Sequence, residues 1–396
     1  MSEIIVLGAG MVGVGTALAL QARGHAVTLI DRRAPGQETS FGNAGVIQAE
    51  AMEPYAMPRA PLTLLHYALG RSNDVKIRWR DLPQFARPVL SYFMASTPRY
   101  HAEVSKVYAR MIAQVRQDHG ALIDAAGADH LIQRTGLGEI YRTDRALTPA
   151  IQDAQRKAET YGLNLRVLHG SRLRAEDTAI QGDIAGALIW DDSWSCTDPG
   201  ALVQSYADLF QQRGGAVQQG DANSLHQTGN GWQVQTDSGL MSAEHAVVAL
   251  GPWSGVFVKR FGYKVPMVLK RGYHTHMTAP SAPIRPYLDA EHGYVLAPMR
   301  AGLRLTSGAE LTGQNRPQRP DQLSHARHAV RGLIPDVTDG DGAIWHGHRP
   351  CLPEMLPRIG KANNHPGLWF NFGHGHQGFT LGPTTGHILA DLLDKG

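Results

Sequence analysis

The feature that most constrains the fold is a strand–turn–helix–strand pattern near the start of the chain. Residues 4–7 form an apolar run typical of a buried strand, and the glycine-rich stretch GAGMVG follows at residues 8–13. Residues 14–23 are rich in Ala and Leu and predict a helix. A second strand at residues 26–30 ends at Asp31. Such a short unit predicts two parallel strands joined by a right-handed crossover.

The spacing of Gly8, Gly10 and Gly13 between a strand and a helix is typical of a dinucleotide-binding turn. These glycines allow a tight turn, close approach of a pyrophosphate and helix–strand contact, while the helix N-terminus supplies N–H donors. Asp31 stands where a carboxylate can accept hydrogen bonds from both ribose hydroxyls. Its negative charge also disfavours a ribose 2′-phosphate. The pattern predicts an adenine dinucleotide. The alternative is a glycine-rich turn without a ligand.

The remaining chain predicts a nucleotide-binding domain made of several segments, interleaved with a second domain. Residues 50–150 contain many prolines and a helical stretch at residues 100–126, while residues 266–310 alternate as antiparallel strands do. Residues 199–214 predict a helix capped by Asp198. A strand at residues 368–372 and a helix at residues 383–393 complete the nucleotide-binding domain.

Composition narrows the class of protein. The net charge of +3 and the scattered basic residues do not favour nucleic acid as a partner. The two cysteines, Cys196 and Cys351, do not favour a disulfide framework and indicate a reducing compartment. The first residues do not resemble a leader, and no apolar run is long enough to span a bilayer. We expect a cytoplasmic protein, with peripheral contact to the inner face of the cell membrane as an open alternative.

The stretch ETSFGNAG at residues 38–45 distinguishes among dinucleotides. Taken alone, it could be an ordinary loop or a surface built for a large ligand to lie close to the backbone. Together with the first motif, Thr39-Ser40-x-x-Asn43-Ala44-Gly45 resembles the second flavin-contacting loop of the D-amino acid oxidase superfamily. Bacterial D-amino acid dehydrogenases and glycine oxidases are the most similar branch.

Three later stretches extend this resemblance in family order. Residues 245–254 are similar to the strand and glycine segment near FAD. Residues 345–360 contain WHGHRPCLPE and PRIG, similar to the family pattern WxGxRPxxPDxxPxIG. Residues 372–380, FGHGHQGFT, resemble the GHGxxG turn. The resemblance covers most of the chain and is least specific over residues 50–150.

The resemblance implies an α/β fold with a Rossmann-like FAD-binding domain of the GR2 type, interleaved with an antiparallel-sheet α+β substrate domain. We expect residues 1–49, 155–265 and 335–396 in the FAD-binding domain and residues 50–154 and 266–334 in the substrate domain. FAD is the implied cofactor. The residues expected to bind it are Gly8, Gly10, Met11, Val12, Gly13, Asp31, Arg32, Thr39, Ser40, Asn43, Ala44, Gly45, Val46, Val217, Gly251, His374, Gly375, His376, Gln377, Gly378, Phe379 and Thr380.

Four residues are implied at the substrate. Arg349 matches the arginine that holds the substrate carboxylate, and Tyr294 matches a tyrosine that assists it. His348 and His376 depart from the family pattern and are expected to face or adjoin the substrate, unless they are hydrogen-bonded structural residues. The His-Gly-His patterns lack a ligand set with metal-site spacing, so no metal is expected.

The implied reaction is FAD-dependent oxidation of a D-amino acid, or of a cyclic imino acid such as a hydroxy-D-proline, by hydride transfer from Cα to flavin N5. Oxygen and a quinone or electron-transfer chain are the two acceptors considered. A glycine- or sarcosine-type secondary amine oxidase is an alternative, as are an NAD-dependent dehydrogenase and a non-enzymatic flavoprotein subunit. The NAD alternative leaves residues 38–46 and 373–380 without a role, and the non-enzymatic alternative has no need for Arg349.

Overall fold

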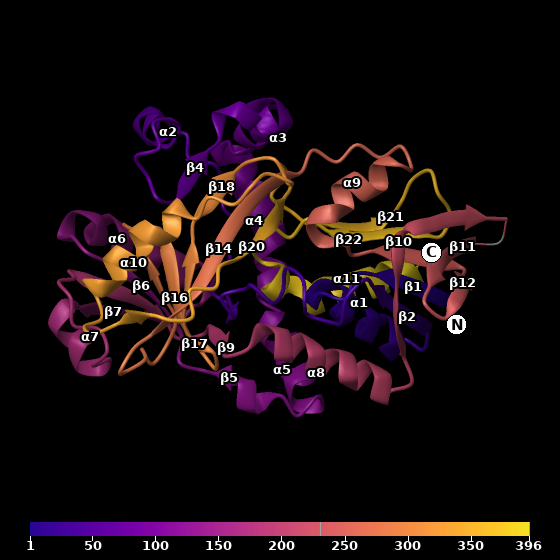
Figure 1. The fold of residues 1–396 in the computed structure, drawn as a ribbon, viewed down its shortest axis with the longest axis horizontal. Coiled ribbons are helices and arrows are strands. Elements are labelled where there is room, and N and C mark those ends of the chain that lie inside the picture. The colour runs from indigo at the N-terminus through magenta and orange to yellow at the C-terminus, as the bar shows by residue number, and fades with distance from the viewer. Residues whose placement is uncertain (230, 396) are drawn as a thin grey trace.

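The structure is a computed structural model that describes residues 1–229 and 231–395. Residue 396, the end of the last segment predicted for the FAD-binding domain, lies outside this range. The described strands form two large sheets and one small one. In Figure 1 the two large sheets lie side by side along the long axis, with both termini at the end formed by the first sheet.

The first sheet has the predicted strand–helix–strand unit at its centre. Strand β1 pairs in parallel with β2 and with β13, and β10 and β22 extend the parallel set on either side. Residues 4–7 of β1 are all buried, as in a parallel sheet whose two faces are both covered. The strand order is β12 (Gly239–Ala243), β11 (Gly231–Thr236), β10 (Ala216–Thr228), β2 (Ala26–Asp31), β1 (Glu3–Leu7), β13 (His245–Val248), β22 (Leu368–Phe372) and β21 (Arg358–Lys361).

Helices α1 (Met11–Ala22) and α11 (Gly378–Asp394) cover one face of this sheet and cross at very close range. A Cβ on Gly382 would lie 2.8 Å from the carbonyl oxygen of Met11, and one on Gly386 would lie 2.6 Å from that of Gly15. This packing explains why α11 begins five residues before the predicted start at residue 383. Although Pro383 weakens a helix locally, the tertiary contact outweighs that cost.

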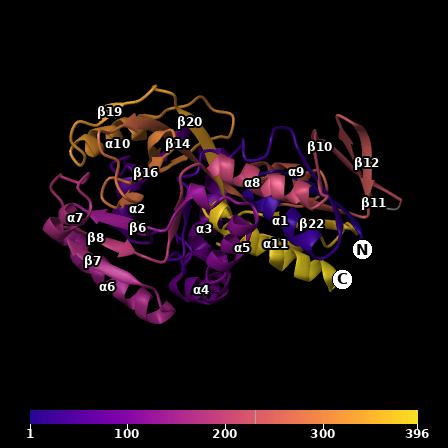
Figure 2. The same cartoon turned by 90° about the horizontal axis from the view of Figure 1, so that it is seen from below.

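Helices α8 (Pro199–Gln212), α4 (Pro98–Ile112) and α5 (Val115–Ala125) complete this layer, and Figure 2 shows α8 beside α1. The Asp198 side chain caps α8 as predicted, accepting from the backbone N–H of Ala201 at 3.0 Å. The helical stretch predicted over residues 100–126 consists of the two helices α4 and α5. The other helical segments are α2 (Pro61–Ala68), α3 (Leu82–Ala95), α6 (Asp144–Tyr161), α7 (Gly170–Glu176), α9 (Ser254–Lys259), α10 (Asp321–Arg331) and the 3-10 turns η1 (Trp79–Asp81), η2 (Asp129–Leu131) and η3 (Gly251–Trp253).

The second sheet is mixed and largely antiparallel, and its long central strand β14 pairs with β17, β18, β19 and β20. Its order is β4 (Val75–Ile77), β18 (Ala309–Leu311), β14 (Val268–Thr278), β17 (Gly302–Ser307), β16 (Tyr294–Met299), β15 (Tyr287–Asp289), β6 (Leu137–Tyr141), β8 (Gly186–Trp190) and β7 (Leu165–His169), with β19 (Thr338–Asp339) and β20 (Trp345–Cys351) beside β14. The small third sheet contains β3 (Val46–Ile47), β9 (Trp194–Cys196) and β5 (Ile132–Gln133).

Sheet membership differs from the predicted division of the chain in three places. Strands β7 and β8 were expected with the FAD-binding domain but pair with β6 in the second sheet. Strands β19 and β20 also belong to the second sheet, through β14. Helices α4 and α5 were expected with the substrate domain but pack beside α11. Each region that the sequence assigned to a single domain therefore contains elements that pack with both large sheets. No described helix has the length and apolar character needed to cross a membrane.

Candidate active site

A cavity of about 910 Å³ lies at the carboxyl ends of β1, β2, β13 and β22 and reaches the second sheet. This is the edge at which open parallel sheets bind nucleotides. Its volume is at the upper end of the range of about 300–1,000 Å³ typical of ligand pockets. The predicted residues that line it are Gly8, Gly10, Met11, Val12, Asp31, Arg32, Thr39, Ser40, Asn43, Ala44, Val46, Gly251, Tyr294, His348, Arg349, His374, Gly375, His376, Gly378 and Phe379.

The glycine-rich turn after β1 has no room for side chains. Gly8 has φ +106°, and a Cβ there would lie 2.5 Å from the carbonyl oxygen of Ala249. A Cβ on Gly13 would lie 1.7 Å from the carbonyl oxygen of Gly8. Gly13 therefore shapes the turn without lining the cavity. The N-terminus of α1 points toward the cavity, where its N–H groups favour an anion.

Asp31 lies at the end of β2, on one side of the glycine-rich turn. Its carboxylate accepts from the backbone N–H groups of Ala9 at 2.7 Å and Arg33 at 3.2 Å. Burial raises the pKa of Asp31 above its usual value. The neighbouring Arg32 lies 4.5 Å from the ring centre of Trp253, across the cavity edge. The carboxylate is thus held at the position expected for a ribose.

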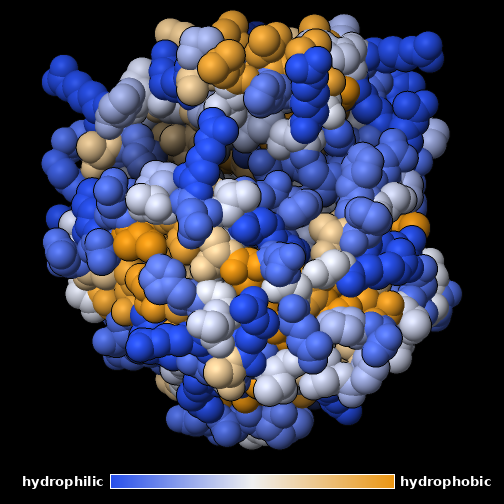
Figure 3. All heavy atoms as spheres, turned by 90° about the vertical axis from the view of Figure 1, so that its left-hand side faces the viewer, coloured by the Kyte–Doolittle hydropathy of each residue, from blue (hydrophilic) through white to orange (hydrophobic). Residues whose placement is uncertain are grey.

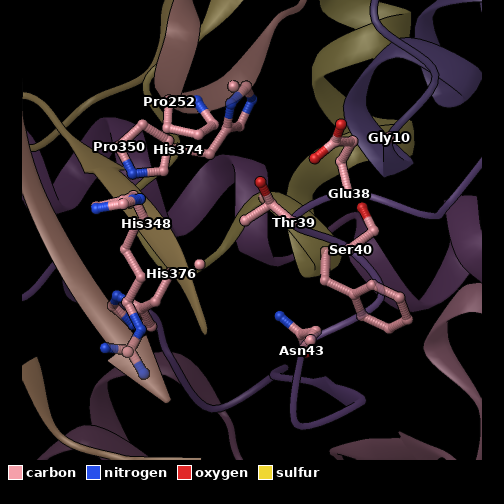
Figure 4. A pocket seen from close by; sticks show the side chains of 18 of the residues that line it. Gly10, Glu38, Thr39, Ser40, Asn43, Pro252, His348, Pro350, His374 and His376 are labelled. Carbon is pink, nitrogen blue, oxygen red and sulfur yellow. The ribbon is translucent and has the colours of Figure 1, made fainter. Parts of the chain in front are cut away.

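The loop at residues 38–45 is hydrogen-bonded to the first turn of α1, and a second hydrogen bond within the loop restricts its C-terminal end. Ser40 Oγ accepts from the backbone N–H of Met11 at 3.0 Å, which joins the loop to the first turn of α1. Asn43 Oδ1 accepts from the backbone N–H of Gly45 at 2.8 Å. Figure 4 shows Thr39, Ser40 and Asn43 along one side of the cavity, with Gly10 and Glu38 nearby.

Arg304 in β17 holds the middle of the same loop from the second sheet. Its Nη1 donates to the carbonyl oxygens of Phe41 at 2.9 Å and Asn43 at 2.6 Å. Burial lowers the pKa of Arg304 to about 10. The ring of Trp345 in β20 packs against Gly42, where a Cβ would lie 1.9 Å from it. The second sheet therefore sets the shape of a loop that belongs to the first.

The N-terminus of α11 is joined to the segment after the loop. Thr380 Oγ1 donates to the carbonyl oxygen of Val46 and accepts from the backbone N–H of Gln48, both at 3.3 Å. Gln377 Nε2 donates to Gln48 Oε1 at 2.7 Å. Gln377 and Thr380 therefore position neighbouring residues and do not themselves line the cavity. Gln48, which no sequence motif singled out, does line it.

Arg349 reaches the cavity from β20. Its Nη1 donates to the carbonyl oxygen of Gly308 at 2.9 Å and its Nη2 to that of Ser307 at 3.1 Å. Lys270 is its partner in the ladder between β14 and β20, so both side chains share one face of the sheet. Among the described residues, no carboxylate lies within ion-pair distance of either cation. Burial lowers the pKa of Arg349. This end of the cavity is suited to an anion.

His376 lies beside these cations. Burial, together with the charges of Arg349 and Lys270, lowers the pKa of His376 to about 3, so the ring is neutral at physiological pH. Its Nε2 is 3.2 Å from Gln377 Nε2, which fixes Nε2 as an acceptor. Its ring also packs edge-on against Tyr55 at a centroid distance of 4.5 Å. His376 thus adjoins the end of the cavity where the substrate is expected.

His348 lines the cavity and is also hydrogen-bonded within the second sheet. Side chains alternate along β20, so His348 and Arg349 point to opposite faces of the strand. His348 Nε2 accepts from Arg271 Nε at 3.3 Å, and burial with the nearby Arg271 charge lowers the pKa of His348 to about 4. Figure 4 shows His348 near Pro350, at the border of the cavity. His348 therefore borders the cavity while its ring is hydrogen-bonded to Arg271, and its role at the substrate stays a prediction.

Tyr294 lines the cavity, and its hydroxyl is hydrogen-bonded within the second sheet. Its side chain is only 1% exposed, and its hydroxyl oxygen accepts from Arg142 Nη2 at 3.1 Å. Arg142 in turn pairs with Asp289 at 2.7 Å. The hydroxyl is therefore engaged in the second sheet, and its role at a substrate carboxylate stays a prediction.

Val217 and Gly45 were expected at the cofactor but do not line the cavity. Val217 pairs with Leu29 inside the first sheet, and residues 220–223 of the same strand line the cavity instead. Gly45 has φ +73°, and a Cβ there would lie 2.2 Å from the carbonyl oxygen of Cys196. Gly45 therefore serves the loop geometry.

A comparison with protein families decides the class of this chain. The family described as DAO, FAD dependent oxidoreductase, matches residues 3–392. The chain belongs to the DAO family of FAD-dependent oxidoreductases. The match covers both large sheets and every predicted site residue. It makes the protein an FAD enzyme and removes the NAD-dependent alternative.

Relatives and solved structures of the DAO family match over nearly the full chain. D-amino acid dehydrogenase of Vibrio cholerae is 30% identical, covering 100% of this chain and 96% of the relative. D-amino-acid oxidase of Bradyrhizobium diazoefficiens is 27% identical, covering 99% of this chain and 94% of the relative. Glycine oxidase from Geobacillus kaustophilus superposes with a TM-score of 0.73 at 20% identity, covering 100% of this chain and 95% of that one. This last likeness shows the shared fold.

The residues around the cavity fit FAD. The turn at Gly8 admits backbone but no Cβ, which is the close approach that a pyrophosphate requires. Asp31 suits the ribose, and the loop with Ser40 and Asn43 would face the pyrophosphate and flavin. The N-terminus of α11, beginning at Gly378, would lie against the flavin with its positive dipole end. Among the described residues, no group of three or more His, Cys, Asp or Glu side chains is arranged to hold a metal ion.

Proposed function

We propose that this DAO-family protein oxidises a D-amino acid or a closely similar cyclic imino acid, such as a hydroxy-D-proline. The observation that carries the proposal is the position of Arg349. It reaches the cavity from β20, and its hydrogen-bond partners are the carbonyl oxygens of Ser307 and Gly308. A substrate carboxylate can supply the missing anion and accept two parallel hydrogen bonds from the guanidinium.

Arg349 fixes where the carboxylate lies and thereby limits the positions that the substrate Cα can take. Lys270, on the same face, adds positive charge at this end. When bound, FAD accepts the hydride that leaves Cα. His376 is neutral and can exchange a hydrogen bond with a polar group of the substrate. No side-chain base is required if the amine reacts in its neutral form.

The electron acceptor, oxygen or a membrane quinone, belongs to the same proposal. A quinone acceptor would require contact with the inner face of the cell membrane, because quinones dissolve in the bilayer. Relatives named both dehydrogenase and oxidase are similar to this chain, so similarity does not separate the two acceptors.

The test is an anaerobic screen for bleaching of the flavin absorbance by D- and L-amino acids, including D-proline and its hydroxy derivatives. We expect bleaching by D-amino or cyclic imino acids and not by their L-enantiomers. Glycine and sarcosine belong in the same screen, since their preference would favour a secondary amine oxidase. An FAD-loaded preparation that none of these compounds reduces would refute the proposed substrate class.

A further inference from the structure

Helix α2 carries an apolar face that the protein does not cover. Leu62, Leu65 and Leu69 have the spacing i, i+3 and i+7, which places side chains on one side of a helix. They are 72%, 50% and 55% exposed, and no residue of α2 is buried. In a globular protein such a stripe usually packs into the core. Here it faces solvent.

The neighbouring helix α3 adds to this surface. Leu90 and Met94 are four residues apart, so they share one side of the helix, and Leu82 stands at its N-terminal end; all three are exposed. Phe85 and Tyr92, on the other side of α3, are buried. The exposed apolar side chains of α3 are therefore distinct from the buried ones that anchor the helix.

Trp79 connects the two helices. It lies in η1, just before α3, is 53% exposed, and donates from Nε1 to the carbonyl oxygen of Ala68 in α2 at 3.2 Å. Figures 1 and 2 both place α2 and α3 next to each other, and Figure 3 shows hydrophobic side chains gathered at the top of the molecule, where α2 lies. We call the following set the docking face: Leu62, Leu65, Leu69, Trp79, Leu82, Leu90 and Met94.

Basic residues accompany the docking face. Residues 55–100 contain seven Lys and Arg against two Asp, a net charge of +5, while the whole chain carries only +3. Of the two acids, Asp81 is buried, while Asp74 is exposed and also lines the cavity. Exposed basic side chains remain beside the apolar ones, including Arg71, Arg80 and Arg87.

We propose that α2, η1 and α3 form a docking face for an anionic lipid bilayer. Exposed leucines, a tryptophan and surrounding arginines on short helices are what an interfacial membrane segment requires: apolar side chains enter the lipid, while basic ones meet anionic headgroups. A second copy of the chain would also cover apolar side chains, but seven basic residues against two acids on the same segment would then repel each other across the twofold interface.

The docking face borders the substrate cavity. Tyr55, which precedes α2, and Asp74, between α2 and α3, both line that cavity. Docking would bring the cavity close to the bilayer surface, where a lipid-soluble acceptor is concentrated. The inference extends the membrane contact proposed above by assigning it to particular residues. It is tested by binding alone, without turnover.

The experiment is flotation of the FAD-loaded protein with vesicles of phosphatidylcholine alone or of phosphatidylcholine with phosphatidylglycerol. We expect the wild type to float with the anionic vesicles and to be released by high salt. One triple variant, Leu62→Ser with Leu65→Ser and Leu69→Ser, and another, Arg71→Glu with Arg80→Glu and Arg87→Glu, should each lower the bound fraction by more than about ten-fold.

The matched controls are Leu240→Ser, an exposed leucine far from the docking face in the sequence, and Arg145→Glu with Arg172→Glu and Arg213→Glu. These should bind vesicles as the wild type does, and flavin absorbance verifies that every variant is folded. Failure of the wild type to bind anionic vesicles, or binding by both triple variants equal to that of the wild type, would overturn the docking face. A dimer that the leucine variant dissociates, without vesicle binding, would assign the face to a second copy. None of these results bears on whether D-amino acids bleach the flavin.

Discussion

Arg349 has an unusual setting for a charged side chain. Its donors meet the carbonyl oxygens of Ser307 and Gly308 while no described carboxylate pairs with it. We expect Arg349→Leu to cost about 3–5 kcal/mol in kcat/KM, because the substrate carboxylate would be left without its partner in a buried site. Arg349→Lys should recover only part of this loss, since lysine keeps the charge but not the planar fork.

The measurements for these variants are flavin occupancy, the anaerobic rate of flavin reduction and substrate affinity. Flavin occupancy should stay near that of the wild type, because Arg349 is assigned to substrate and not to cofactor. Arg172→Leu, at an exposed position, is the control. Unchanged reduction and affinity in Arg349→Leu would remove this residue from the site, and with it the main reason for an amino acid substrate.

Glu50 is a buried carboxyl next to the cavity wall. Gln48 Nε2 donates to Glu50 Oε1 at 2.6 Å, and Ser193 donates to the other oxygen. Burial raises the pKa of Glu50 from 4.5 to about 7. Between these two values the unfolded chain has lost the proton while the folded protein retains it, so stability falls as pH rises through this window and is level above it.

Comparison with a Glu50→Gln variant isolates this effect. The free energy of unfolding of the wild type, relative to the variant, should decrease as pH rises from 4.5 to about 7. Urea unfolding of both proteins at several pH values measures it. Glu103→Gln, at an exposed residue, is the control. A difference between wild type and Glu50→Gln that does not change with pH would mean that Glu50 ionises normally in the folded protein.

At the scale of elements, the loop at residues 38–45 depends on the strands that hold it. Gly45 has φ +73°, and Cys196 in β9 occupies the space that its Cβ would need. We expect Gly45→Ala to reduce stability through both backbone strain and this collision. Strain alone costs about 1–2 kcal/mol for an L-residue in this conformation, and the collision should add about 1–3 kcal/mol.

Gly127→Ala separates the two contributions. Gly127 has a similar φ of +61°, but a Cβ at this position would meet no other atom within 4 Å, so only the strain should remain. Denaturant unfolding of the two variants gives the difference. FAD affinity should fall in Gly45→Ala and stay constant in Gly127→Ala. Equal losses of stability would show that β9 does not restrict the loop.

Across the whole molecule, local patterns predicted the elements of the first sheet better than the pairings made by the second sheet. The turn at residues 8–13, Asp31 and the loop at residues 38–45 were predictable because strand, turn and helix follow each other directly in the chain. The hydrogen bond from Arg304 to the carbonyl oxygen of Phe41 joins residues 263 positions apart, and no local sequence pattern predicts such a pairing. The same holds for Lys270 opposite Arg349, which depends on strand register.

The different directions of His348 and Arg349 are predictable from the sequence, since adjacent residues of one strand point to opposite faces. Recognising residues 345–351 as a strand would have separated His348 from Arg349. The setting of Tyr294 could not be predicted in this way. Its hydroxyl accepts a hydrogen bond from Arg142, the residue that follows β6. This hydrogen bond forms only when β6, β15 and β16 have assembled.

The cavity extends from Asp31 on the first sheet to Arg349 on the second, so a ligand that fills it joins both halves of the molecule. We expect the purified protein to be yellow and to release FAD, not FMN, on denaturation, because only FAD has an adenosine half to reach Asp31. Bound FAD should also raise the melting temperature, as any ligand specific for the folded state does.

Asp31→Ala should weaken FAD binding by about 1–3 kcal/mol, the value of charge-assisted hydrogen bonds to the ribose. Titration of the apoprotein with FAD measures this loss, with Asp237→Ala at an exposed site as the control. Asp31 also accepts from the backbone of Ala9, so the melting temperature of each apoprotein is needed to separate binding from folding. If Asp31→Ala binds FAD as tightly as the wild type, the adenosine half does not lie at this edge of the first sheet. A colourless protein that cannot be reconstituted with FAD would contradict the placement of the cofactor altogether.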